Sequence, residues 1–233
     1  MIVAIDGPAG AGKTTVARRL ARRLGVPLLD TGAIYRTLAL VAQRRGVDWD
    51  DEPALVALCR DFPIRFGELD PGAPDDAPQR VWFSGEDVTL EIRTPQMSQG
   101  ASKVSAVPGV RAALLDIQRA LGAHGCVAEG RDMGTVVFPD TPHKFFVTAD
   151  VTTRAQRRRE ELRHLAAGGA AVPSLEEVER DIEERDQRDS SRAAAPLAQA
   201  ADAVLVDTSG LDADAVLDQI VALITADRSR RPG

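Results

Sequence analysis

The chain has 233 residues and a formal net charge of −6, with 44% hydrophobic but only 4% aromatic residues. This length suits one α/β domain with insertions, and the negative charge argues against a general affinity for DNA or acidic membranes. The cysteines, Cys59 and Cys126, are far apart and form no C-x-x-C pair, which predicts reduced core thiols. Because the chain also has no signal peptide and no membrane-spanning apolar run, we expect a soluble, cytoplasmic protein.

The first predicted element is a short apolar strand over residues 2–5, followed over residues 7–14 by the pattern G-x-x-x-x-G-K-T. Apolar residues then repeat at helical spacing, with arginines on the other face, which predicts a helix over 13–25. A strand, a Gly-rich loop and a helix in this order are typical of a phosphate-binding P-loop. Its backbone N–H groups would surround phosphate oxygens, Lys13 would place a charge between the β- and γ-phosphates, and the Thr14 hydroxyl could ligate Mg²⁺. The sequence therefore predicts a site for a nucleoside triphosphate.

Short strand-like runs alternate with longer helical patterns along the chain. This alternation predicts an α/β fold with a parallel sheet that is covered by helices on both faces. The predicted strands are 2–5, 26–30, 126–129, 144–148 and 203–206. The predicted helices are 13–25, 33–46, 51–60, 94–106, 108–123, 152–167, 174–192 and 212–227.

Two segments break this alternation. Residues 63–89 contain strand-like runs at 64–66 and 81–83 that are joined by a segment rich in Pro, Gly and Asp, which predicts a small antiparallel insertion with a mobile tip. Residues 166–173 separate two strongly charged helices and contain the pair Gly168-Gly169. This pattern is typical of a helical arm that closes as a lid, and a surface helical hairpin is an equal alternative.

A P-loop alone does not separate a kinase from a GTPase or a motor ATPase. A GTPase that reads guanine needs an N-K-x-D element, and this chain contains no asparagine. Residues 207–210 match the loose pattern D-x-x-G, but they follow the last predicted strand and are therefore interpreted as a turn. The GTPase interpretation is thus excluded.

Three further segments place arginine beside acidic residues, namely D-T-G-A-I-Y-R at 30–36, G-R-D-M-G-T at 130–135 and R-D-Q-R-D-S-S-R at 185–192. The second follows the carboxyl end of a strand, where open α/β sheets bind ligands. In the third, positions 185, 189 and 192 share one helical face. That face could instead be a solvated surface of Glu–Arg pairs.

Together with the start D-G-P-A-G-A-G-K at 6–13, these motifs resemble, in order, the bacterial cytidylate kinase family of nucleoside monophosphate kinases. The resemblance runs from residue 2 to about 206 and includes the insertion. It implies a three-layer P-loop kinase fold with a parallel sheet, a helical lid and a small antiparallel insertion. It also implies one domain, with its core at 1–62, 90–150 and 200–227, the insertion on the acceptor side at about 63–89 and the lid at about 151–192.

The resemblance implies a reaction and its partners. ATP would donate a phosphoryl group to CMP or dCMP in the presence of Mg²⁺, giving ADP and CDP or dCDP. No nucleic acid or membrane would take part, and the protein would act as a monomer. Two alternatives remain, a P-loop kinase for another nucleotide or small metabolite, and an ATP-binding regulatory protein.

The resemblance also implies residue roles. Arg36, Arg131 and Arg192 would hold the acceptor phosphate, and Arg157 the transferring group. Cytosine would be read by Ser102, Arg111 and Asp132, and the sugar approached by Arg185 and Asp189, with Thr31 and Tyr35 also in the CMP site. ATP would be bound by Gly7, Pro8, Ala9, Gly10, Ala11, Gly12, Lys13, Thr14 and Thr15. Thr14 would ligate Mg²⁺, and Glu129 would contact the ion through a bound water. Alternatively, Glu129 would be a structural carboxylate with no role in binding the ion.

The chemistry of the base supports this assignment. Cytosine presents an N4 amine beside the N3 and O2 acceptors, so a carboxylate at Asp132 suits the amine and a guanidinium at Arg111 suits the acceptors. Uracil would place its O4 against the Asp132 carboxylate, acceptor against acceptor. A nucleoside monophosphate is largely dianionic at pH 7, so the attacking oxygen needs no strong general base. We therefore expect catalysis by positioning and charge neutralisation, with the closed lid excluding water.

Overall fold

A parallel five-stranded sheet forms the centre of the computed structural model, which describes residues 1–70, 72–74, 77–165 and 172–230. In spatial order its strands are β2 (Leu28–Asp30), β6 (Cys126–Gly130), β1 (Ile2–Asp6), β7 (His143–Thr148) and β8 (Val204–Asp207). The register places Asp6 beside Gly130 and Asp30 beside Glu129. The carboxyl ends of β1, β2 and β6 therefore meet at one edge, and the predicted parallel sheet is confirmed.

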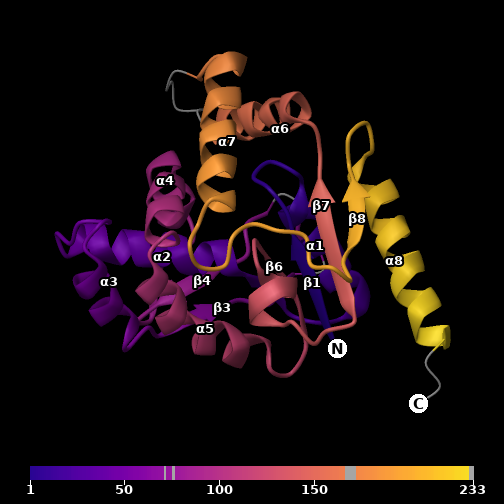
Figure 1. Cartoon of the computed structure of the whole chain (residues 1–233), viewed down its shortest axis with the longest axis horizontal. Helices are drawn as coiled ribbons and strands as arrows, with labels where there is room; N and C mark the ends of the chain where they lie inside the picture. Colours follow the sequence, from indigo (N-terminus) through magenta and orange to yellow (C-terminus); the bar gives the residue numbers. More distant parts are fainter. Residues whose placement is uncertain (71, 75–76, 166–171, 231–233) are drawn as a thin grey trace.

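Helices cover both faces of this sheet (Figure 1). On one face, Val3 and Ile5 of β1 join the core that contains residues of α1 (Lys13–Leu24) and α8 (Ala213–Arg230). On the other face, Ala4 joins the core built with α2 (Thr31–Arg44), α3 (Glu52–Cys59), α4 (Pro95–Val104) and α5 (Pro108–Gly122). Neighbouring residues of β1 thus face opposite layers, as expected for a strand buried on both sides.

The helices begin at positions that their capping residues define. The Asp30 carboxylate accepts the Ala33 backbone N–H at 2.9 Å, so α2 begins at Thr31 rather than at the predicted residue 33. The Thr94 hydroxyl accepts the Met97 N–H at the start of α4. Because Asp30 also ends β2, the chain passes directly from strand to helix at the edge where the strand ends meet.

The predicted insertion is a three-stranded antiparallel sheet of β3 (Ile64–Phe66), β4 (Val81–Phe83) and β5 (Glu86–Asp87), followed by the short 3₁₀ helix η1 (Glu91–Arg93). The first two strands confirm the prediction. The third was not predicted, because both of its residues are acidic and exposed. The Gln79 side chain donates to the carbonyl of Leu28 at 3.1 Å, which attaches the insertion to β2. Three residues of the predicted mobile tip, 71, 75 and 76, lie outside the described residues.

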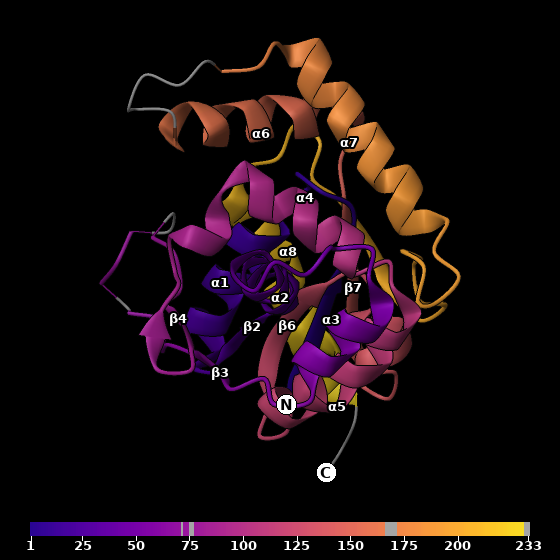
Figure 2. The same cartoon turned by 90° about the vertical axis from the view of Figure 1, so that its left-hand side faces the viewer.

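Two helices, α6 (Val151–Leu165) and α7 (Leu175–Ser190), form an arm that projects beyond the sheet (Figure 2). Ala155, Val178 and Ile182 pack together between them. Arg154 of α6 donates to the Ala9 carbonyl at 3.1 Å and to the Asp186 carboxylate at 2.5 Å, so it joins the P-loop to both arm helices. The predicted Gly168-Gly169 tip lies outside the described residues.

A further element, the π-helix η2 (Met133–Val137), directly follows the loop after β6. This element was not predicted, because one short turn leaves no hydrophobic period. Among the helices of the described residues, none combines the length and apolar composition that crossing a membrane requires.

Candidate active site

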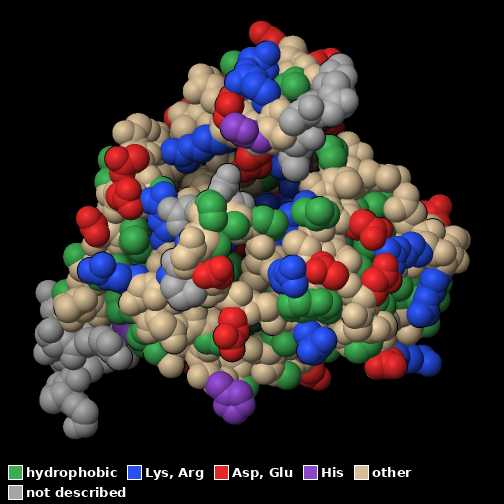
Figure 3. All heavy atoms as spheres, turned by 180° about the vertical axis from the view of Figure 1, so that it is seen from behind, with side chains coloured by type: hydrophobic (Ala, Val, Ile, Leu, Met, Phe, Trp, Pro, Cys, Tyr) green, Lys and Arg blue, Asp and Glu red, His purple; other side chains and the backbone are tan. Residues whose placement is uncertain are grey.

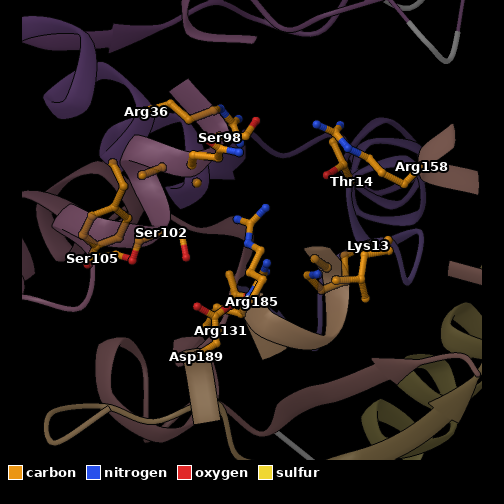
Figure 4. Close-up of a pocket in the computed structure, with 18 of the residues that line it drawn as sticks. Lys13, Thr14, Arg36, Ser98, Ser102, Ser105, Arg131, Arg158, Arg185 and Asp189 are labelled. Carbon is orange, nitrogen blue, oxygen red and sulfur yellow. Dashed lines mark hydrogen bonds and ion pairs between the residues drawn. The ribbon is translucent and has the colours of Figure 1, made fainter. Parts of the chain in front are cut away.

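A cavity of about 780 Å³ lies where the P-loop, the ends of β2 and β6, α4 and the arm meet. Figure 3 shows a hollow beneath the arm with lysine and arginine side chains in it. In the close-up, Arg36, Ser98, Ser102 and Ser105 lie on one side and Lys13, Thr14 and Arg158 on the other, with Arg131, Arg185 and Asp189 between them (Figure 4). The predicted site residues that line the cavity are Ala9, Gly10, Gly12, Lys13, Thr14, Thr15, Thr31, Tyr35, Arg36, Ser102, Arg111, Glu129, Arg131, Asp132, Arg185, Asp189 and Arg192.

The P-loop needs its glycines for two physical reasons. Gly10 and Gly12 have φ of 75° and 83°, a left-handed conformation that favours glycine. At Gly7, a Cβ would lie only 1.9 Å from the Val147 carbonyl oxygen, so no side chain fits against β7. Gly7, Pro8 and Ala11 do not line the cavity. They belong to the backbone turn that positions the neighbouring, cavity-lining residues of the P-loop.

Lys13 is buried at the base of this loop. Its Nζ donates to the Pro8 carbonyl at 2.6 Å. Burial, together with the nearby Arg131 guanidinium, holds the pKa of Lys13 well below its ordinary range, while Glu129 and Asp6 oppose that shift. An anion in the cavity would therefore stabilise the charged form of Lys13.

Thr14 meets an acidic partner from the neighbouring strand. Its hydroxyl donates to Oε2 of Glu129 at 2.9 Å, and the Thr31 hydroxyl donates to the Glu129 carbonyl at 2.7 Å. Burial raises the pKa of Glu129 to about 7, with the nearby Asp30 acting in the same direction. Its Oε1 has no hydrogen-bond partner within the described part of the chain. A buried, half-satisfied carboxylate beside a P-loop hydroxyl fits a nearby hydrated cation.

No cluster of three or more His, Cys, Asp or Glu side chains suited to a metal ion occurs among the described residues. Mg²⁺ that is bound together with a nucleotide keeps several waters and uses one or two protein groups plus phosphate oxygens.

At the far end of the cavity, Arg111 and Asp132 form a buried ion pair, with only 7% and 4% of their side chains exposed. The Arg111 guanidinium also lies over the Tyr35 ring, 5.6 Å from its centroid, and donates to the Ser105 carbonyl at 3.2 Å. The predicted base-reading residues thus come from α4, α5 and the loop after β6 and line one cavity, to which α2 adds Tyr35. A carboxylate and a guanidinium fixed side by side present acceptors and donors to the same planar ligand edge.

Ser102 of that group is tied to the arm. The Arg188 guanidinium of α7 donates to the Ser102 hydroxyl at 2.7 Å. Arg188 lies within the R-D-Q-R-D-S-S-R motif, but no role was predicted for it.

Between the two ends, several arginines surround a single acidic residue. The buried Asp189 accepts from Arg131 Nε at 2.8 Å and from Arg192, whose Nη2 also donates to the Ser105 hydroxyl. Burial and the neighbouring Arg131 lower the pKa of Arg185 to about 9. The buried Nε atoms of Arg36, Arg111, Arg185 and Arg192 have no hydrogen-bond partner among the described residues. This excess of unsatisfied donors fits a bound polyanion.

The structure places Arg157 outside the cavity. Its guanidinium donates to the Thr208 hydroxyl at 2.8 Å and to the Thr208 carbonyl at 2.9 Å. The next residue, Arg158, lines the cavity instead. Both arginines follow Arg154 at helical spacing, three and four residues later. Arg157 also approaches the P-loop, since its Nη1 lies 3.6 Å from where a Cβ of Gly12 would be. Because the two arginines are adjacent in the sequence, only their contacts in the structure separate them.

The D-x-x-G segment forms the predicted turn, in which Asp207 accepts the Ser209 N–H at 2.8 Å. The turn also contacts the P-loop, since the Thr208 hydroxyl donates to the Ala11 carbonyl at 3.2 Å.

The model of the cytidylate kinase family matches residues 3–226 of this chain. The cytidylate kinase of Pseudomonas paraeruginosa is 51% identical over 221 residues, which cover 94% of this chain and 93% of that protein. The cytidylate kinase of Syntrophotalea carbinolica is 46% identical over 225 residues, covering 96% and 92%. A crystal structure of an uncharacterized protein from Eubacterium ventriosum matches this chain with a TM-score of 0.52 at 16% sequence identity. The match covers 97% of this chain and 98% of that one, and at this identity it supports the fold alone.

Proposed function

This chain belongs to the cytidylate kinase family, and we propose that its cavity holds ATP at the P-loop and CMP or dCMP at the end formed by Arg111 and Asp132. The reaction transfers the γ-phosphoryl group of ATP to the nucleoside monophosphate, giving ADP and CDP or dCDP. The observation that carries the placement is the buried Arg111–Asp132 pair, which faces the P-loop across one continuous cavity.

On the donor side, the P-loop backbone and Lys13 hold the phosphates. Thr14 would ligate Mg²⁺, and Glu129 would bind a water of that ion through Oε1. When bound, Mg²⁺ would supply charge neutralisation at the phosphate oxygens. Arg158, which lines the cavity near Thr14, contacts the transferring group, the role that the family resemblance gave to Arg157.

On the acceptor side, Arg36, Arg131 and Arg192 hold the phosphate of CMP. Each is oriented by a carboxylate behind it, Asp30 for Arg36 and Asp189 for the other two. Bidentate guanidinium contacts suit the dianionic phosphate group. Arg185 and Asp189 lie next to this group and reach the sugar.

At the base, the Asp132 carboxylate accepts from the N4 amine of cytosine, and Arg111 and Ser102 meet N3 and O2. Tyr35 supports Arg111 from behind through its ring. With uracil, O4 would face the carboxylate and leave two buried acceptors opposed, which costs binding energy.

The chemistry needs no general base from the protein. A phosphate oxygen of CMP forms a bond to the γ-phosphorus while the bond from that phosphorus to the β,γ-bridging oxygen breaks, and the electron pair leaves with ADP. Lys13 and the arginines offset the charge while the attacking and leaving oxygens are held in line. Closure of the arm excludes water, which would otherwise accept the phosphoryl group.

The arrangement of parts follows from this assignment. Residues at about 63–89 form the insertion on the acceptor side, residues at about 151–192 form the lid, and residues 1–62, 90–150 and 200–227 form the core. We also propose that the protein acts as a monomer in the cytoplasm.

A panel of acceptors tests the function. ADP formation is measured with ATP and Mg²⁺ in the presence of CMP, dCMP, UMP, AMP or no acceptor. We expect turnover only with an acceptor, and the highest kcat/KM with CMP or dCMP. Acceptor-independent ADP formation would indicate an ATP-binding regulator, and a preference for UMP or AMP would indicate a different kinase.

A further inference from the structure

The carboxylate of Asp6 joins the strand that leads into the P-loop to the loop that carries Arg131 and Asp132. Asp6 is the last residue of β1 and lies beside Gly130 of β6 in the sheet. It is 4% exposed. Its Oδ1 accepts the Met133 backbone N–H at 2.7 Å, and its Oδ2 accepts the Gly134 N–H, also at 2.7 Å. Each oxygen of the carboxylate therefore fixes one peptide group.

The two N–H groups that Asp6 binds belong to the residues that directly follow Asp132. Asp132 has φ −147° and ψ 25°, outside the regular helical and extended regions, so it needs support from its neighbours. Its carbonyl accepts the Val136 N–H at 2.9 Å and the Val137 N–H at 3.1 Å. Asp6 holds the next two N–H groups from the opposite side. The backbone on the C-terminal side of Asp132 is thus clamped between β1 and the π-helix η2.

The chemistry of this clamp requires a carboxylate. A carboxylate has two acceptor oxygens, whereas an amide of the same shape has one acceptor and one donor group. In an Asp6→Asn variant, the NH₂ group would face one of the two backbone N–H groups, donor against donor. The loop would then shift to relieve this contact.

We infer that Asp6 is a positioning residue for the recognition of cytosine: through the Met133 and Gly134 N–H groups, it sets the Asp132 carboxylate in place from the strand that also carries the P-loop. This inference rests on the proposed reading of cytosine by Asp132. It gives the Asp of the D-G-P start a function on the acceptor side of the cavity, although its sequence neighbours bind the donor.

The test compares kcat/KM for CMP and for UMP, with ATP saturating, in the wild type, Asp6→Asn, Asp132→Ala and the double variant. The ratio of the two values does not depend on the fraction of folded enzyme, because both substrates meet the same active molecules. We expect Asp6→Asn to lower the CMP/UMP ratio by about tenfold or more, with the KM for ATP changed by less than about threefold. In the double variant, Asp6→Asn should not lower the ratio below that of Asp132→Ala, since both act on one contact.

The possible failures are distinguishable. If Asp132→Ala leaves the ratio unchanged, the proposed reading of cytosine is wrong. If Asp132→Ala lowers the ratio but Asp6→Asn reduces CMP and UMP turnover equally, or raises only the KM for ATP, the positioning role of Asp6 is overturned. If Asp6→Asn does not fold, Asp6→Ser takes its place, because serine also keeps a single acceptor oxygen. The expected CMP/UMP ratio is the same for both variants. Asp207→Asn is the matched control, because Asp207 also accepts a backbone N–H at a strand end but lies far from Asp132 in the sheet order.

Discussion

The Thr14 hydroxyl donates to the Glu129 carboxylate at 2.9 Å, although 115 positions separate the two residues in the chain. The contact joins the first turn of α1 to the carboxyl end of β6, the neighbour of β1 in the sheet. It places an acidic group beside the hydroxyl that we propose as the Mg²⁺ ligand.

The first prediction concerns this pair. Thr14→Ala removes the hydroxyl and should raise the Mg²⁺ concentration for half-maximal activity by about tenfold, the equivalent of about 1.4 kcal/mol. Thr14→Ser keeps the hydroxyl and should stay close to the wild type. A magnesium titration of kcat at saturating ATP and CMP measures the difference. Equal titration curves for the two variants would contradict the ligand role.

The second prediction concerns the arginines around Asp189. Arg131→Ala and Arg192→Ala each remove a charge-assisted contact that we propose to the acceptor phosphate, so each should cost a few kcal/mol in kcat/KM for CMP while leaving the KM for ATP nearly unchanged. Arg163→Ala is the control, because Arg163 is exposed on α6 and its side chain pairs only with the exposed Glu160 among the contacts described. Loss of ATP affinity alone would instead place these arginines on the donor side.

The third prediction separates two adjacent arginines of the arm. Arg158→Ala should lower kcat by about 100-fold, because Arg158 lines the cavity near Thr14 and would lose a contact worth about 3 kcal/mol in the transition state. Arg157→Ala should raise the KM for ATP with a smaller effect on kcat, since Arg157 holds the Thr208 turn beside the P-loop. Steady-state kinetics of both variants decide the question. The reverse pattern would restore the role of Arg157 that the family resemblance implies.

The fourth prediction follows from the raised pKa of Asp6. Burial raises this pKa from 3.8 to about 6, although the Gly134 and Met133 N–H groups lower it in part. Between these values the folded state binds more protons than the unfolded state, so this group's contribution to the unfolding free energy is complete below pH 3.8 and is lost as the pH rises through 6. The full loss is about 3 kcal/mol, of which about 2 kcal/mol falls between pH 4.5 and pH 7.

Asp6→Asn lacks this titration and isolates its contribution. The unfolding free energy of the wild type minus that of Asp6→Asn, from urea titrations, should decrease from pH 4.5 to pH 7. For Asp207→Asn the corresponding difference should change little over this range, because the Ser209 N–H lowers the pKa of Asp207 from 3.8 and its titration therefore lies below the range. A difference between the wild type and Asp6→Asn that does not change with pH would show that Asp6 titrates near its ordinary value.

Much of the fold could be predicted because the local sequence patterns of strands and helices agree with the residues that are buried. The β1 strand, the P-loop and α1 follow directly from the glycine pattern and the helical period. The start of α2 was placed two residues too late, because the capping role of Asp30 competes with its role as the last residue of β2. The strand β5 and the π-helix η2 carry too few residues to show a period, so only tertiary contacts reveal them.

The residues of the site could be predicted where they belong to a recognisable sequence motif. Arg111 lies outside the quoted motifs and was assigned through the family resemblance, and its ion pair with Asp132 is visible only in the structure. Asp6 and Arg188 lie inside the motifs, yet their partners, two backbone N–H groups and a serine of α4, are distant in sequence. Adjacent arginines such as Arg157 and Arg158 are equivalent in a sequence pattern and differ only in the direction that the helix gives them.

The central claim is that the Asp132 carboxylate reads the amine of cytosine. The most direct test is kcat/KM for CMP and for UMP in Asp132→Ala, with ATP and Mg²⁺ saturating. The substitution removes both the acceptor for the cytosine N4 amine and the repulsion of the uracil O4. The kcat/KM for CMP should therefore fall by about 100-fold or more, while the kcat/KM for UMP changes much less. The CMP/UMP ratio should shrink accordingly. Equal losses for both substrates, with an unchanged ratio, would mean that Asp132 only orients its neighbours Arg111 and Arg131, and would contradict the account.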